Sequence, residues 1–99
     1  MRDEFISKIG VYGQMHYRYL LENKPSVLGV MRMKGTLRQY LEEVNIDAEE
    51  MLARLETEMA KNEGVTEALK RQDQMEWVQR KNNIRARAME IVQREVIFV

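Results

Sequence analysis

A sustained heptad pattern between residues 37 and 59 constrains this chain more than any other feature of its sequence. Apolar side chains recur there at spacings of three, four and seven residues: Leu37, Leu41, Val44, Ala48, Met51, Leu52, Leu55 and Met59. That spacing predicts a long amphipathic helix with a coiled-coil-like seam. Thr36 and Gln39 form a capping-box pattern in front of it. Gly64 follows as a stop, so we expect the helix to run to about Asn62, roughly 40 Å in all.

A second long helix is expected from Gln74 to Val96, where the chain contains neither glycine nor proline. Asp73 and Glu76 have the spacing of an N-cap residue and the carboxylate that reaches back to it. One broad face of this helix is apolar and holds Trp77, Val78, Ile84, Ala88, Ile91 and Val92. The four residues that close the chain, 96–99, are apolar as well, so we expect them to dock on the rest of the fold.

Three further helices are expected, over residues 4–23, 26–34 and 66–72. Gly10 and Gly13 lower the helix propensity of the first, but they leave a flat side where another helix can approach closely. Pro25 suits the first turn of the second helix, and Gly35 suits its left-handed end. With one proline, five glycines and no strand-like alternation, the 99 residues predict an all-α fold. We expect a single domain over residues 1–99, a small helical bundle or a homodimer.

Composition excludes several classes of protein. Charged residues make up 32% of the chain and hydrophobic residues 44%, which is too apolar for disorder and too charged for a membrane span. The absence of cysteine excludes disulfides and thiolate metal sites. The opening residues MRDEF are followed by no apolar segment of the signal-peptide type, so we expect a cytoplasmic protein without membrane contact.

The net charge is zero, but charge is segregated along the chain. Residues 1–41 carry +4, residues 42–67 carry −7 and residues 68–99 carry +3. This pattern favours pairing of an acidic helix with basic ones, within one chain or between subunits. It argues against a uniformly basic DNA-binding surface.

No constellation of residues predicts catalysis or metal binding. His16 is the only histidine and lies among tyrosines on an apolar face, so we interpret it as a hydrogen-bonded residue at the edge of the core. Glu42, Glu43, Glu49 and Glu50 lie opposite the heptad seam, and no Glu-x-x-His pair of the di-iron type accompanies them. We therefore expect no enzyme, no metal and no cofactor, and interpret the glutamates as a solvated face. In the alternative hypothesis they imitate a nucleic-acid backbone for a basic partner.

Basic residues of the C-terminal helix are the candidates for nucleic-acid contact. Arg80, Asn83, Arg87 and Arg94 line one face, whereas Lys81 and Arg85 fall inside the apolar sector. Long basic side chains in such a position bury their stems and place their charged ends at the rim. For Arg85 we favour an ion pair with an acidic residue of a neighbouring helix over direct contact with nucleic acid.

Three stretches carry a resemblance to a known family. They are MEWV (75–78), NNIRARA (82–88) and EGVTE (63–67), and all three lie in the segment 63–92. A second segment, 15–44, shares the resemblance, and the acidic helix lies between the two segments. Together they resemble the transposon-encoded protein TnpV family over nearly the whole chain. The resemblance implies a place on bacterial mobile elements, beside a recombinase, as an accessory or regulatory protein. It supplies no catalytic residues.

Two hypotheses for the function follow. In the first, the protein is a DNA-associated factor for transposition or excision. A short helix joined by a tight turn to a longer basic helix, 66–72 and then 74–95, is compatible with a helix-turn-helix. In the second, it is an interaction module or inhibitor that binds a recombinase or a host nuclease through a helix face, without DNA contact. The zero net charge, the acidic helix and the long seam favour this alternative.

Overall fold

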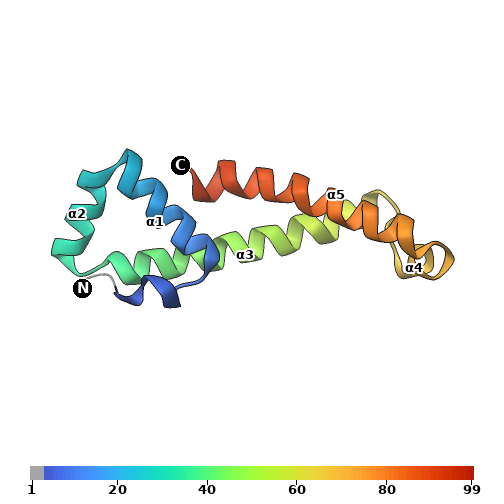
Figure 1. Cartoon of the computed structure of the whole chain (residues 1–99), viewed down its shortest axis with the longest axis horizontal. Coiled ribbons are helices and arrows are strands. Elements are labelled where there is room, and N and C mark those ends of the chain that lie inside the picture. The colour runs from blue at the N-terminus through green and yellow to red at the C-terminus, as the bar shows by residue number, and fades with distance from the viewer. Residues whose placement is uncertain (1–3) are drawn as a thin grey trace.

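The computed structural model describes residues 4–99, and every regular element in that range is helical (Figure 1). In chain order the elements are the 3₁₀-helix η1 (Glu4–Lys8), α1 (Val11–Asn23), α2 (Pro25–Lys34), α3 (Leu37–Asn62), α4 (Glu67–Gln72), α5 (Gln74–Val92) and the π-helical turn η2 (Gln93–Ile97). The predicted all-α fold, with a long central and a long C-terminal helix, is confirmed. No helix of the described range combines the length and apolar character needed to cross a bilayer.

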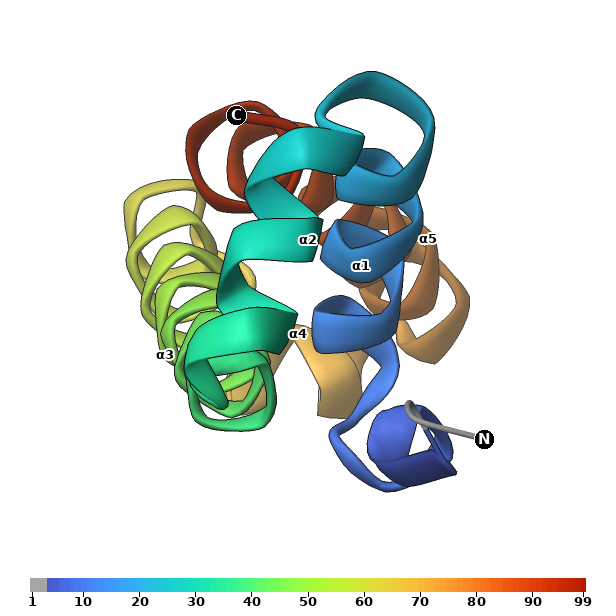
Figure 2. The same cartoon turned by 90° about the vertical axis from the view of Figure 1, so that its left-hand side faces the viewer.

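The molecule is a rod built around α3. Its extents are 55 × 21 × 17 Å and its radius of gyration is 17.1 Å, against about 13 Å for a compact domain of this length. α5 returns antiparallel along the second half of α3, while η1, α1 and α2 gather at the other end (Figure 1). The view along the rod shows α1 and α2 lying together in front of the α3–α5 pair (Figure 2). The N-terminal half of α3 is therefore covered by more helices than its C-terminal half.

The heptad seam of α3 contributes to both hydrophobic clusters of the core. At one end, Leu37 and Leu41 pack in a cluster with Ile9, Leu20 and Leu28. Farther along, Ala48 and Leu52 pack in a cluster with Ala88, Val92 and Ile97. Met51, Leu55 and Met59 are only partly buried. Up to Leu52 the seam is thus covered by helices of the same chain, as expected for an intramolecular bundle.

Most of the predicted helix ends are confirmed. Gly35 and Gly64 both have positive φ, 71° and 72°, as left-handed helix-terminating residues do. Pro25 is the first residue of α2, and the Thr66 side chain accepts a hydrogen bond from the backbone N–H of Leu69 (3.3 Å).

The predicted capping box of Thr36 and Gln39 is wrong. Thr36 has φ −105° and ψ −2°, and its side chain caps nothing. Its N–H donates to the carbonyl of Met31 (3.0 Å), so the turn out of α2 already fixes its backbone near the helical region. A capping side chain needs an extended backbone at that position. Gln39 instead donates to Glu43 (3.3 Å).

The predicted first helix is divided by Gly10. The chain forms η1, turns at Gly10 with φ +102°, and begins α1 at Val11. A Cβ on Gly10 would clash with the side-chain amide of Asn45, so only glycine allows this approach. The predicted flat side is confirmed at Gly13, where a Cβ would lie 2.8 Å from the backbone oxygen of Leu41.

Asn45 of α3 fixes the start of α1. Its side-chain oxygen accepts hydrogen bonds from the N–H groups of Tyr12 (3.0 Å) and Gly13 (3.1 Å). Its amide donates to Glu49 one turn later (2.9 Å). These N–H groups have no acceptor within α1 because they lie in its first turn. A side chain of α3 thus caps α1 across the interface between them.

Candidate nucleic-acid interface

α5 lies on α3 through one apolar face. Ile84, Ala88 and Val92 are buried, as predicted, while Trp77 is partly buried and Val78 is exposed. The helix starts where expected, because the Asp73 carboxylate accepts the N–H of Glu76 (3.1 Å). Most of its polar side chains are exposed and are thus available to a partner.

Arg80 and Arg87 lie together at the end of α3, on one flank of α5. Arg87 donates to the carboxylate of Glu63 (2.7 Å), and Arg80 donates to the backbone carbonyl of the same residue (3.5 Å). Arg80 is also paired with Glu76 (2.9 Å). The hydrogen bond from Arg87 lowers the pKa of Glu63, and the reciprocal bond raises the pKa of Arg87. Both arginines are therefore held by carboxylates of their own chain.

Arg85 lies on the opposite flank of α5. It pairs with Glu56 of α3 at 3.1 Å, which confirms the predicted ion pair with a neighbouring helix. Its side chain remains 57% exposed. The three arginines therefore do not form one continuous row. They border the outward side of α5 from both edges.

The other predicted contact residues have separate surroundings. Lys81 lies 6.0 Å from the ring centre of Trp77, on the side of α5 that faces away from the arginine pair. The Asn83 side chain accepts from Arg87 (2.8 Å), so it belongs to the flank of Arg80 and Arg87. Arg94 lies beyond α5, in η2, next to Glu95 (3.5 Å). The six candidates thus lie on both flanks of α5 and beyond its end, and do not form one face.

An uncharged strip on α5 was missed by the sequence analysis. Gln79, Asn82, Asn83 and Ala86 are all exposed. On the helical wheel Gln79, Asn82 and Ala86 lie opposite Ile84, and Asn83 lies at the edge of this strip toward Arg87. The signal was present in the sequence, because these residues recur at spacings of three and four.

The acidic face of α3 points outward as predicted. Glu42 pairs with Arg38 (3.7 Å), Glu43 accepts from Gln39, and Glu49 accepts from Asn45. Glu50 is exposed. Three of the four carboxylates therefore have partners on their own helix.

Comparison with models of known protein families assigns this chain to one of them. The model of the family described as "Transposon-encoded protein TnpV" matches residues 1–97. The chain belongs to the TnpV family. Searches among curated proteins and among solved structures gave no match.

The single histidine of this TnpV family member is buried in the core and hydrogen-bonded to residues of other segments. His16 is 1% exposed. Its Nδ1 donates to the carbonyl of Ile97 (2.6 Å), because a carbonyl only accepts, and its Nε2 is hydrogen-bonded to the hydroxyl of Tyr40 (2.8 Å). Burial raises the pKa of Tyr40. His16 thus joins α1, α3 and the docked C-terminal segment, as the prediction of a hydrogen-bonded histidine requires.

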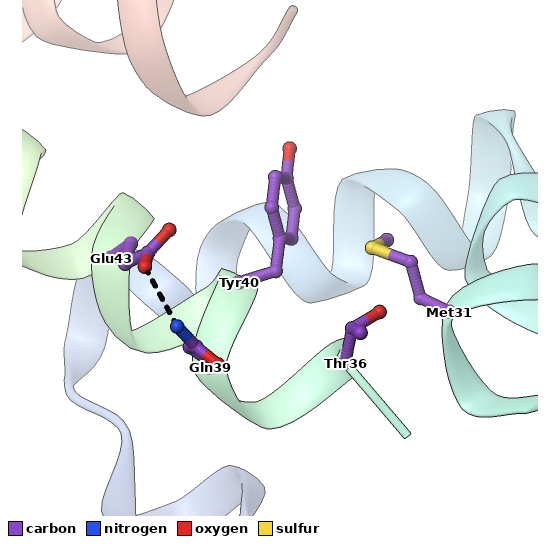
Figure 3. Close-up of a pocket in the computed structure, with 5 residues that line it drawn as sticks. All are labelled: Met31, Thr36, Gln39, Tyr40 and Glu43. Atoms are coloured by element: carbon purple, nitrogen blue, oxygen red, sulfur yellow. Dashed lines mark hydrogen bonds between the residues drawn. The ribbon is translucent and has the colours of Figure 1, made fainter. Parts of the chain in front are cut away.

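A shallow depression of about 280 Å³ lies between α2 and α3 of this TnpV protein. It is lined by Met31, Thr36, Gln39, Tyr40 and Glu43 (Figure 3). The hydroxyl of Tyr40 points away from the other four side chains, so their polar groups do not converge on one point. Within residues 4–99, no group of three or more histidines and carboxylates could hold a metal ion.

Proposed function

We propose that this chain is a non-enzymatic accessory or regulatory protein of a bacterial mobile element, which binds DNA through α5 and acts with a recombinase. The observation that carries the proposal is the outward side of α5, bordered by Arg80, Arg85 and Arg87. Their side chains are 42 to 57% exposed. Arginine is suited to phosphate because its planar fork of donors matches two phosphate oxygens. Membership of a transposon-encoded family supports a setting in which DNA is rearranged.

The carboxylates beside these arginines are compatible with phosphate binding. Exposed ion pairs contribute little to stability, so the guanidinium of Arg87 exchanges Glu63 for a phosphate at small cost. The outward glutamates of α3, such as Glu43 and Glu50, lie on the other side of the helix pair. The rod is 17 to 21 Å across. That exceeds the Debye length of about 8 Å at physiological ionic strength, so their repulsion of DNA is largely screened.

A salt series of DNA-binding measurements tests this proposal. Arg80, Arg85 and Arg87 are replaced together by Gln, and binding to a duplex of about 30 base pairs is followed by fluorescence anisotropy. We expect weaker binding, and a plot of log K against log salt that is flatter by up to about 2.7, because each phosphate contact contributes about 0.9 to the slope. Circular dichroism melting checks that the variant is folded.

The matched control removes the same amount of charge elsewhere. Arg38, Arg54 and Lys61 are exposed on α3, away from α5, and their replacement by Gln changes the net charge equally. This control should keep the wild-type salt dependence apart from a small long-range effect. Equal losses in both triple variants, or no loss in either, would rule out α5 as the DNA-binding surface.

A second candidate function rests on an exposed isoleucine on the acidic face of α3. Ile46 is 51% exposed, and Glu42, Glu43, Glu49 and Glu50 lie three and four residues to either side of it. Neighbours at those spacings surround a helical residue. An apolar centre with an acidic rim suits a basic protein surface, such as that of a recombinase. Replacing the four glutamates by Gln should abolish such a complex, while the arginine variant should keep it.

We also propose that the protein is a homodimer. The rod shape and the partly buried Met51, Leu55 and Met59 support a second copy packing beside the α3–α5 pair. Light scattering after gel filtration should give twice the chain mass of 11.8 kDa. A mass of one chain at micromolar concentration would reject the dimer.

A further inference from the structure

The uncharged strip on α5 has the composition and position of a surface that recognises DNA bases. Gln79, Asn82, Asn83 and Ala86 face outward, and Ile84 and Ala88 on the opposite side are fully buried. On the helical wheel, Arg85 lies about 100° to one side of the strip and Arg87 about 100° to the other. The strip is thus the part of α5 that lies between Arg85 on one side and Arg80 and Arg87 on the other.

We propose that this strip enters the major groove of duplex DNA and recognises adenine. The inference rests on the proposed DNA-binding function. The major groove is about 12 Å wide and admits an α-helix, and the amides of Asn and Gln pair with N6 and N7 of adenine. A methyl group such as that of Ala86 contacts the methyl group of thymine. The site is therefore a short segment containing A·T pairs.

Two of the three amides that would contact the bases are not engaged elsewhere. Within residues 4–99, Gln79 and Asn82 have no hydrogen-bond partner for their side chains. Asn83 accepts from Arg87, so a move of Arg87 to a phosphate releases it. From Gln79 to Ala86 the strip is about 10 Å long, which is the rise of about three base pairs.

Carboxylates mark both ends of the strip. Glu90 is exposed one turn beyond Ala86, and its charge opposes close approach of the phosphate backbone there. At the other end, Glu76 is paired with Arg80 (2.9 Å). The contact is therefore confined to the middle of α5, residues 79–86.

A protein partner suits this strip less well than DNA does. The centres of protein interfaces are enriched in aromatic residues, methionine and arginine. The strip offers three amides and one methyl group, and the exposed Met75 lies only at its N-terminal edge. The bordering arginines match the phosphates on either side of a groove, which is the charge complementarity that favours DNA.

Selection from a library of random duplexes tests the inference. The wild-type protein should enrich a motif that contains A·T pairs. Replacing Gln79 and Asn82 by Ala should weaken binding to the selected duplex about tenfold or more, and leave binding to a scrambled duplex within about twofold. The control variant replaces Asn62 and Gln72, exposed amides at the ends of α3 and α4, by Ala and should keep the wild-type preference.

Binding to chemically modified DNA tests whether the strip contacts bases in the major groove. Replacing the selected adenines by 7-deazaadenine removes the N7 acceptor from the major groove. Wild-type affinity should fall, whereas that of the Gln79 and Asn82 variant should change little, because the contact is already lost.

The possible failures are distinguishable. If the wild type binds no duplex even at low salt, the proposed DNA-binding function is wrong and the inference falls with it. If the wild type binds duplexes with the expected salt dependence but selection returns no motif, the function stands and the inference is wrong. The inference is also wrong if the Gln79 and Asn82 variant keeps the full preference, or loses a complex with a recombinase instead.

Discussion

Replacing Asn45 by Ala should be among the most damaging single changes at a polar residue of this protein. The Asn45 side chain is 7% exposed and accepts the N–H groups of Tyr12 and Gly13. Alanine removes that acceptor and puts no other group in its place. The first turn of α1 then has two donors without a partner at the α1–α3 interface.

The magnitude follows from the burial of the two donors. A buried donor left without a partner costs about 1–3 kcal/mol. The Gly13 N–H is buried and should cost about 2 kcal/mol, whereas the Tyr12 N–H is partly buried and should cost about 1 kcal/mol because water reaches it. The total of about 3 kcal/mol is a large part of the 5–15 kcal/mol that stabilises a typical domain. The melting temperature should fall by roughly 10–25 °C.

Urea denaturation followed by circular dichroism measures this loss, with two matched variants. Asp47→Ala changes an exposed residue of the same helix turn and should stay within about 0.5 kcal/mol of the wild type. Asn45→Asp keeps an acceptor for α1 but loses the bond to Glu49, so its stability should fall between the other two. Hydrogen exchange should show the largest loss of protection at Tyr12 and Gly13. If the free energy of unfolding of Asn45→Ala stays within about 0.5 kcal/mol of the wild type, Asn45 does not stabilise α1 as a cap.

Two further predictions concern the same end of the molecule. Gly13→Ala places a Cβ 2.8 Å from a backbone oxygen of α3 and should destabilise the protein by about 1–3 kcal/mol. In the same denaturation experiment Gly29→Ala is the control, because its Cβ meets nothing within 4 Å. It should stabilise the protein by about 0.5–1 kcal/mol. His16→Phe removes both hydrogen bonds of the histidine, so carboxypeptidase should release Phe98 and Val99 faster than from the wild type; an unchanged rate would show that the histidine does not hold the C-terminal segment.

The features that the sequence predicted correctly depend on residues close together in the chain. The C-terminus of α3 at Asn62, the left-handed Gly64 and the Asp73 cap of α5 all follow from spacings of a few residues. The ion pair of Arg85 was predicted because a charged group in an apolar sector needs a partner. Its identity, Glu56, required the register of α5 on α3.

The features that the sequence did not reveal depend on contacts between distant residues. Asn45 lies beside the seam of α3, and nothing nearby in the sequence indicates that it caps a helix 32 residues earlier. The break at Gly10 follows from the same contact, because the glycine is where the chain passes the Asn45 side chain. The wheel placed Arg80 and Arg87 on one face correctly. Their shared partner Glu63 became evident only from the turn between α3 and α4.

The two halves of α3 differ in how many helices cover them, and this difference bears on the proposed interface. The N-terminal half packs against α1 and α2, and η2 also packs on α3, whereas the C-terminal half has α5 as its main neighbour. Local opening has the lowest free energy where buried contacts are fewest. We therefore expect amides at the α4–α5 end of the rod to exchange their hydrogens before those of α1.

Glu63 connects that end of the rod to α5 through its carboxylate and its carbonyl, which accept from Arg87 and Arg80. A phosphate would withdraw both arginines from Glu63. DNA bound to α5 should therefore slow amide exchange at residues 79–86, beneath the contact, and leave residues 63–66 unprotected, because the arginines have released them. A protein bound to the acidic side of α3 should instead protect the amides around Ile46. Protection at residues 79–86 without protection near Ile46 is thus the pattern that assigns the partner to α5.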